Sequence, residues 1–261
     1  MYKQKISISI NSKVDREKVF DEFEALLGNL CKTGQIQGNY EEGYFADNEI
    51  IFYQTTLEKN SFSKSFNDKY VSDRLKKIET LCNAKLKTEI VGESIPQYKP
   101  VCKCKEHKYF VLFTQAYYGT SPIECGNCSR VVPIYRLKKL TNDDRYLLIS
   151  WVTNYKACDD LQLGCSVGER WATKQMTDPN SQLSKDGLEV CSRIKRATGI
   201  PTFYYLYNYR NISLEKDKMR KCPSCNNDWI LKETLNKYYD FKCEKCDLIS
   251  SLTSNLRLNY A

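Results

Sequence analysis

Histidine is almost absent from this sequence: His107 is the only one in 261 residues. Because histidine is the usual base that activates serine and cysteine nucleophiles, its scarcity argues against Ser-His-Asp and Cys-His catalysis. The chain also lacks a phosphate-binding loop and a dinucleotide-binding glycine fingerprint. Acidic residues at Asp159-Asp160 and Glu169 offer an alternative catalytic chemistry, but such residues more often cap helices or face solvent. We therefore expect no catalytic residues and no small-molecule substrate.

Long apolar runs are missing as well. No stretch approaches the ~18 to 20 consecutive apolar residues that a membrane-spanning helix needs. The first ten residues lack the apolar block and the small-residue cleavage site of a signal peptide. Apolar residues still make up 41% of the chain and aromatic residues 12%, which is enough to form a core. We expect a globular, cytoplasmic protein that does not contact membranes.

Cysteine, by contrast, is abundant, with 13 residues. Thiols are kept reduced in the cytosol, so close cysteine pairs there indicate metal binding rather than disulfides. Eight of the thirteen form four close pairs, at 102/104, 125/128, 222/225 and 243/246. The others stand alone: Cys31, Cys82, Cys158, Cys165 and Cys191. Cys158 and Cys165 allow a third metal site or a redox pair, but free cysteine is commonly buried, so we favour core packing.

The two C-terminal pairs have the spacing of a zinc ribbon. Cys222-Pro-Ser-Cys225 is followed after seventeen residues by Cys243-Glu-Lys-Cys246. In each Cys-x-x-Cys turn both sulfurs reach one ion, and a second pair from a neighbouring hairpin completes a tetrahedron. The strand-forming residues 229–231 and 238–241 between the pairs predict that hairpin. Four thiolates close the coordination shell, so we expect a structural Zn²⁺ site rather than a catalytic one.

The earlier pairs predict a second, less regular Zn²⁺ site. Cys102-Lys-Cys104 is followed after twenty residues by Cys125-Gly-Asn-Cys128. In a strand, residues i and i+2 point to the same face, so Cys102 and Cys104 would face one ion, and Gly126 would ease the opposite turn. His107 is an alternative to Cys102, since Cys104-x-x-His107 is also a competent pair. We favour four cysteines over three cysteines and one histidine, and expect two structural ions per chain.

Positive charge is concentrated in the cysteine-containing segments. The chain carries a formal charge of +8, of which residues 99–146 contribute +5 and residues 216–261 contribute +3. Lysine and arginine neutralise phosphates, and aromatic faces stack on unpaired bases, so nucleic acid is a candidate partner. The candidate contact residues are Tyr135, Arg136, Lys138, Lys139, Arg210, Lys218, Arg220 and Lys221. Core packing of the tyrosines beside solvated charge is the competing interpretation.

Apolar periodicity predicts an α+β protein. Residues 5–11 alternate as a strand, a helix runs from Asp15 to near Gly34, residues 46–48 form a hairpin turn, and a second helix and a strand follow. This β-α-β-β-α-β order is that of a ferredoxin-like sandwich, assigned to residues 1–95. Residues 94–100 are the expected linker.

The rest of the chain is expected to form two further domains. Residues 96–215 are predicted to be a small central α/β domain that carries the first zinc site. We expect its secondary structure to be a buried strand at 146–155, a helix from Ser184 to Gly199 and a strand at 203–207. Residues 216–261 are predicted to be the zinc ribbon.

Several strings resemble a bacterial family of uncharacterised proteins described as zinc-ribbon-containing nucleic-acid-binding candidates. They are residues 121–128, 132–136, 157–163, 167–170, 199–207 and 222–246. The resemblance implies two zinc knuckles around a central domain, and residues 1–95 lie outside it. It also suggests an alternative role, in which the chain is an immunity protein that neutralises a bacterial protein toxin by direct binding. The sequence departs from the resemblance at Ser129, where we expect a bulkier residue after Cys128.

Overall fold

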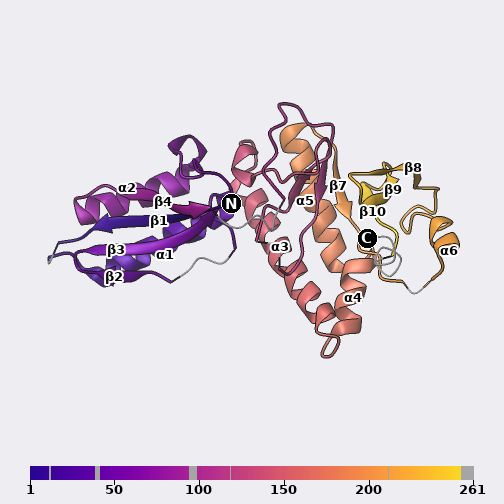
Figure 1. The fold of residues 1–261 in the computed structure, drawn as a ribbon, viewed down its shortest axis with the longest axis horizontal. Helices are drawn as coiled ribbons and strands as arrows, with labels where there is room; N and C mark the ends of the chain where they lie inside the picture. The colour runs from indigo at the N-terminus through magenta and orange to yellow at the C-terminus, as the bar shows by residue number, and fades with distance from the viewer. Residues whose placement is uncertain (12, 39–41, 94–98, 118, 211, 254–261) are drawn as a thin grey trace. The chain divides into compact units, whose positions relative to one another are not determined.

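The chain folds into two compact units (Figure 1). A computed structural model describes residues 1–11, 13–38, 42–93, 99–117, 119–210 and 212–253. The first unit holds Met1–Val101 with Gly119–Ser121 and Val132–Lys138, and the second holds Cys102–Tyr118, Pro122–Val131 and Lys139–Ala261. The predicted boundary at residue 95 and most of the expected linker, residues 94–98, lie outside the described residues. No described helix is long and apolar enough to cross a membrane.

The first unit has the predicted order of strands and helices. Its elements are β1 (Tyr2–Ser9), α1 (Arg16–Thr33), β2 (Tyr44–Ala46), β3 (Glu49–Thr56), a 3₁₀ turn (Lys64–Phe66), α2 (Lys69–Cys82) and β4 (Lys87–Glu93). The four strands form one sheet in the order β2-β3-β1-β4, and every neighbouring pair is antiparallel. The buried side chains of α1 and α2 pack with Ile6, Ile8 and Phe52 in one core.

Local signals in the sequence account for these boundaries. The Asp15 carboxylate accepts a hydrogen bond from the Lys18 amide at 3.2 Å and starts α1. Gly34 ends that helix in the left-handed region, with φ of 75°. Asp68 caps α2 in the same way as Asp15, and Asp47, with φ of 50°, closes the predicted hairpin between β2 and β3.

A short segment distant in sequence completes the first unit. Residues 132–138 contain a 3₁₀ turn (Ile134–Arg136), and Tyr135 is 1% exposed. The Tyr135 hydroxyl donates to the Glu58 carboxylate at 2.8 Å and lies 3.2 Å from the Ser61 hydroxyl. Its ring packs on Phe66, with ring centroids 4.5 Å apart. The segment is therefore part of the core of this unit.

The second unit is built on a six-stranded sheet in the order β6-β5-β7-β10-β9-β8. Its elements are β5 (Phe110–Leu112), β6 (Ile123–Cys125), α3 (Asn142–Leu163), α4 (Glu169–Thr177), α5 (Gln182–Thr198), β7 (Thr202–Tyr205), α6 (Leu214–Lys218), β8 (Ile230–Leu235), β9 (Tyr239–Cys243) and β10 (Leu248–Ser250). Strand β7 pairs in parallel with both β5 and β10. The predicted central α/β domain and the predicted ribbon therefore share one sheet.

The strand predicted at residues 146–155 is wrong, because these residues belong to α3. The helix begins with a capping box, in which Thr141 and Asp144 bond each other's backbone amide groups. The buried residues of α3 recur every three or four positions: Arg145, Leu148, Trp151, Tyr155, Cys158 and Gln162. The dense apolar run at 147–152 obscured this helical period and resembled a buried strand.

Helices α3, α4 and α5 pack together, and α5 lies against β7 (Figure 1). The Trp151 ring meets the Tyr204 ring edge-on at a centroid distance of 6.0 Å. Gly187 of α5 makes this contact possible, because an added Cβ there would lie 2.3 Å from the Tyr204 ring and 2.8 Å from Trp151 Nε1. The helix layer therefore depends on a glycine in the middle of a helix.

We predict that Gly187→Ala destabilises the protein by roughly 1–3 kcal/mol, because the methyl group overpacks two buried rings. Gly28→Ala in α1 is the matched control, since an added Cβ there meets nothing within 4 Å. That substitution should raise the free energy of unfolding by about 0.5–1 kcal/mol. Denaturant unfolding followed by circular dichroism measures both. Equal effects of the two substitutions would contradict the packing described here.

Candidate metal centres

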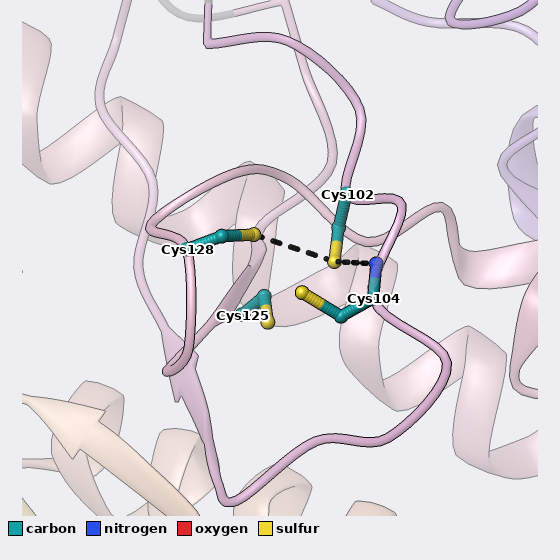
Figure 2. Close-up of side chains that lie close together, drawn as sticks. All are labelled: Cys102, Cys104, Cys125 and Cys128. Atoms are coloured by element: carbon teal, nitrogen blue, oxygen red, sulfur yellow. Dashed lines mark hydrogen bonds between the residues drawn. The ribbon is translucent and has the colours of Figure 1, made fainter.

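Four cysteines of the second unit converge on one point (Figure 2). The sulfurs of Cys102, Cys104, Cys125 and Cys128 all lie within 4.8 Å of one another, and Cys128 Sγ is 3.5 Å from Cys102 Sγ. Four sulfurs at Zn–S distances of ~2.3 Å in a tetrahedron are about 3.8 Å apart. The cluster therefore has the donor set and the size of a tetrahedral metal site.

The C-terminal cysteines form a second cluster of the same kind. The sulfurs of Cys222, Cys225, Cys243 and Cys246 also lie within 4.8 Å of one another, and Cys225 Sγ is 3.6 Å from Cys243 Sγ. In both clusters two cysteines are buried and two are half-buried. The two four-cysteine groups predicted from the sequence are thus brought together, and each is able to hold a metal ion.

Three of the four cysteine pairs end in the same backbone turn. The residue after the second cysteine has a positive φ: 59° at Ser129, 59° at Asn226 and 50° at Asp247. Small polar residues tolerate this left-handed conformation better than bulky or β-branched ones. Ser129, which departs from the family resemblance, therefore suits its turn.

The first cluster differs from the predicted geometry in two details. Cys102 and Cys104 lie in irregular backbone instead of a strand, although their sulfurs still converge, and the Cys104 amide donates to Cys102 Sγ at 3.3 Å. Gly126 has no positive φ; its role is steric, because a Cβ there would lie 2.5 Å from the Tyr109 ring. The glycine lets that ring pack against the turn between Cys125 and Cys128.

His107 lies beside the first cluster and contacts one of its sulfurs. Its Nδ1 atom is 3.2 Å from Cys125 Sγ, and its ring packs against Phe110 at a centroid distance of 4.9 Å. The four cysteine sulfurs form a complete donor set without it. The geometry favours four thiolates as ligands and His107 as a hydrogen-bond partner of the Cys125 sulfur.

Metal binding must release protons from these thiols. Burial raises the pKa of Cys102, and burial also raises the pKa of Cys246 in the second cluster. A hydrogen bond from the Asn227 backbone amide lowers the pKa of Cys225 to about 7. Only thiolates bind the ion, so each cluster changes charge when it loads.

Both clusters lie at the end of the sheet where β7 begins. Cys125 is paired with Phe110, which is paired with Thr202, the first residue of β7. On the other side, Cys243 is paired with Leu248, which is paired with Tyr204. Two clusters that are more than ninety residues apart in sequence are therefore joined through one short strand.

A buried cation supports the second cluster. Arg220 forms an ion pair with the buried Asp217 at 3.0 Å, and its guanidinium lies 4.7 Å from the Trp229 ring centroid and 4.2 Å from that of Phe241. The Trp229 indole donates to the Arg220 carbonyl at 2.9 Å. Arg220 therefore fixes the chain that leads into Cys222, a role that charge and aromatic spacing alone did not reveal.

The predicted nucleic-acid contacts separate into three groups. Tyr135 is buried and Arg220 is enclosed by rings, so neither presents a surface to a base or a phosphate, and their assignment as contacts is corrected. Arg136 is ion-paired with Glu58. The remaining cations are exposed to solvent: Lys138, Lys139, Arg210, Lys218 and Lys221.

The lone cysteines form no further cluster with metal-ligand geometry among the described residues. Cys82, Cys158 and Cys191 are buried, so the core packing expected for Cys158 is confirmed. Cys31 is half-buried. The core packing expected for Cys165 is wrong, because this residue is exposed between the end of α3 and the start of α4.

Comparisons with known proteins identify relatives but no activity. Residues 1–92, 104–207 and 211–256 match three models, each described as a domain of unknown function (DUF8589, DUF2310 and DUF8594, respectively). An uncharacterized protein of Haemophilus influenzae is 39% identical over 145 residues, which cover 56% of this chain and 71% of that protein. A second one is 40% identical over 149 residues, 56% of each chain. None of these descriptions names zinc or nucleic acid. The resemblance seen in the sequence named both.

A solved structure described as an antibiotic biosynthesis monooxygenase aligns with 36% of this chain and 99% of its own. The sequence identity is 8% and the TM-score is 0.26. A likeness of this size does not establish a shared fold or activity.

We predict that Cys125→Ser lowers the metal content of the purified protein from two ions per chain to one, whereas His107→Ala leaves it at two. Loss of the His107 contact should only weaken the site, by roughly 10–100-fold in affinity, as for other hydrogen-bond partners of metal ligands. Elemental analysis gives the ion count, and competition with a chelator gives the affinity. Retention of two ions in Cys102→Ser with loss of one in His107→Ala would instead identify a site of three cysteines and His107.

Proposed function

This chain belongs to the same family as the Haemophilus influenzae protein of which it covers 71%, and we propose that it is a non-enzymatic zinc protein that acts by binding a macromolecule. Two four-cysteine clusters of tetrahedral size support zinc, which is commonly held by four thiolates in structural sites. Iron is the other metal that this donor set accepts, and elemental analysis separates the two.

A structural role follows from the number of ligands. With four thiolates bound, no coordination position is left for water or a substrate. Tyr109 packs against Gly126 in the turn of the first cluster, and Arg220 fixes the chain that leads into the second. We also propose that the first unit is a ferredoxin-like sandwich, a classification supported by its sheet order β2-β3-β1-β4 and its one-sided helix layer.

The surface that best fits a polyanion is the end of the sheet that carries both clusters. We call it the knuckle edge and define it by its exposed cations: Lys103, Lys105, Lys108, Arg130, Lys195, Arg196 and Lys245. Lys195 and Arg196 lie in the last turn of α5, and Lys195 contacts Asp247 of the second cluster's turn at 3.6 Å. The Phe110 amide bonds the Pro201 carbonyl at 2.8 Å, which holds the first cluster near the same helix end.

Metal loading reduces the charge available for phosphate binding. Four thiolates contribute −4 and the divalent ion +2, so each loaded cluster carries −2. The formal charge of the chain then falls from +8 to +4 for the two clusters. The charge that favours nucleic acid therefore lies in the exposed side chains of the knuckle edge, and we propose nucleic acid as its ligand. Binding to a protein toxin stays a prediction from the sequence.

We predict that the metal-loaded protein binds a labelled single-stranded oligonucleotide with an affinity that falls steeply as salt rises, because phosphate contacts release counterions. The double substitution Lys103→Glu/Lys108→Glu should weaken binding about tenfold or more and reduce the salt dependence. The matched control is Lys69→Glu/Lys76→Glu, which makes the same charge change at exposed positions of α2. Fluorescence anisotropy at several salt concentrations measures all three proteins.

Equal weakening in the two double variants would mean that only net charge matters and would remove the knuckle edge as the binding site. Absence of salt-dependent binding to DNA and to RNA would contradict the nucleic-acid proposal while leaving the metal centres intact, since the ion count is measured separately.

A further inference from the structure

Strand β4 forms one edge of the sheet in the first unit. It follows β1 in the order β2-β3-β1-β4, and no described strand pairs with its outer side. Six of its seven residues are exposed, including Ile90 at 44% and Val91 at 56%. An uncovered edge presents unpaired N–H and C=O groups that are able to pair with another strand. This edge is therefore available to a partner.

The pairing with β1 fixes where the side chains of β4 point. Lys87 and Glu89 lie opposite Ser7 and Lys5, on the face of the sheet away from the helices. Thr88 lies opposite Ile6, whose side chain packs in the helix-covered core. Lys87 and Glu89 therefore share the open face, with Thr88 between them on the other face.

Regular pairing stops directly after Ile90. The register shifts between Lys3 and Gln4 of β1, so that Ile90 is opposite Gln4 while Gly92 is opposite Lys3, and Val91 is left over as a bulge. The regularly paired stretch of β4 is therefore residues 87–90, and Thr88 lies within it with one charged residue on each side.

This stretch is complementary to itself in charge and in polarity. In an antiparallel pair centred on Thr88, Lys87 lies opposite Glu89 of the second copy, and Glu89 lies opposite its Lys87. Both charge pairs fall on the open face. On the other face Leu86, which directly precedes β4 and packs at the edge of the core, lies opposite Ile90 of the second copy, so that an apolar pair flanks the two threonines on each side. We propose that β4 pairs with β4 of a second copy of this chain, with Thr88 on the two-fold axis.

The neighbouring registers are disfavoured by the same side chains. Moving the centre from Thr88 to Glu89 places two glutamates opposite each other, and moving it to Lys87 places two lysines opposite each other. Like charges directly opposite destabilise a strand pair. If one copy slips by one residue, Lys87 and Glu89 on its open face lie opposite residues of the other copy that point to the helix-covered face. The two charge pairs are then lost. The register centred on Thr88 is therefore selected in two ways. It pairs opposite charges, and it places residues of the same sheet face opposite each other.

Charges and bulges on an edge strand usually prevent association, and β4 has both. Here the two charges have opposite sign and stand two residues apart on one face, so a second copy in the centred register meets attraction. The bulge at Val91 limits the paired stretch. A short pairing of this kind gives a weak, concentration-dependent dimer, and the strand involved contains none of the metal-ligating cysteines.

The test uses two charge reversals in the full-length, metal-loaded protein. Sedimentation velocity over a range of concentrations should show a reversible monomer–dimer equilibrium for the unmodified chain. Lys87→Glu and Glu89→Lys should each weaken it roughly tenfold or more, since each creates two like-charge pairs. An equimolar mixture of the two variants should restore dimers, because one chain then presents two glutamates and the other two lysines.

Lys76→Glu, an exposed charge reversal on α2, is the control and should leave the dimer unchanged. Thermal melting of each variant shows that it is folded, and recovery of dimers in the mixture excludes loss of fold as the cause. A monomer at every concentration would overturn the proposal. Dimers that resist both reversals, or variants that stay monomeric when mixed, would overturn it equally.

Discussion

The parallel pairing of β7 with β5 and β10 is the interaction on which the second unit depends. Thr202–Tyr205 is only four residues long, yet it joins the strand beside the first cluster to the strand beside the second. A small metal knuckle buries little apolar surface of its own. By sharing one sheet, the two knuckles also share the helix layer of α3 and α5, which covers β7 through Trp151 and Tyr204.

On the other side of β7 the sheet buries a second apolar group of residues. Tyr109, Val111, Phe203, Tyr239 and Ile249 form it, and the buried Tyr239 hydroxyl donates to Glu124 at 2.9 Å. That bond connects β9 with β6, strands separated by three others in the sheet order. The sheet therefore bends enough for residues of its two metal-bearing parts to form a direct hydrogen bond.

Electrostatics links the metal centres to the surface around them. Formal charge from the sequence counts every cysteine as neutral, but a loaded four-cysteine centre carries −2. Some of the nearby lysine and arginine charge therefore compensates the thiolates. Only the exposed lysine and arginine side chains remain available to a partner. The sequence did not distinguish them from buried cations such as Arg220, whose charge is satisfied by Asp217 and two aromatic rings.

The sequence by itself determined the features that depend on short-range spacing. The two four-cysteine groups, the hairpin of the ribbon, the caps at Asp15 and Gly34 and the element order of residues 1–93 follow from neighbouring residues or from simple periodicity. It failed at residues 146–155, where a dense apolar run hid the helical period that begins at the Thr141 capping box. There, packing on β7 decided which face of the helix is buried. A local sequence pattern does not contain that information.

Only the tertiary structure decided which distant segments meet. It placed Tyr135 in the core of the first unit, merged the predicted central domain and ribbon into one sheet, and put His107 against Cys125 as a neighbour of a complete thiolate set. It also left the charges of β4 on an uncovered edge. These outcomes arise from long-range burial and strand pairing, whose free energy depends on partners that are far away in the chain.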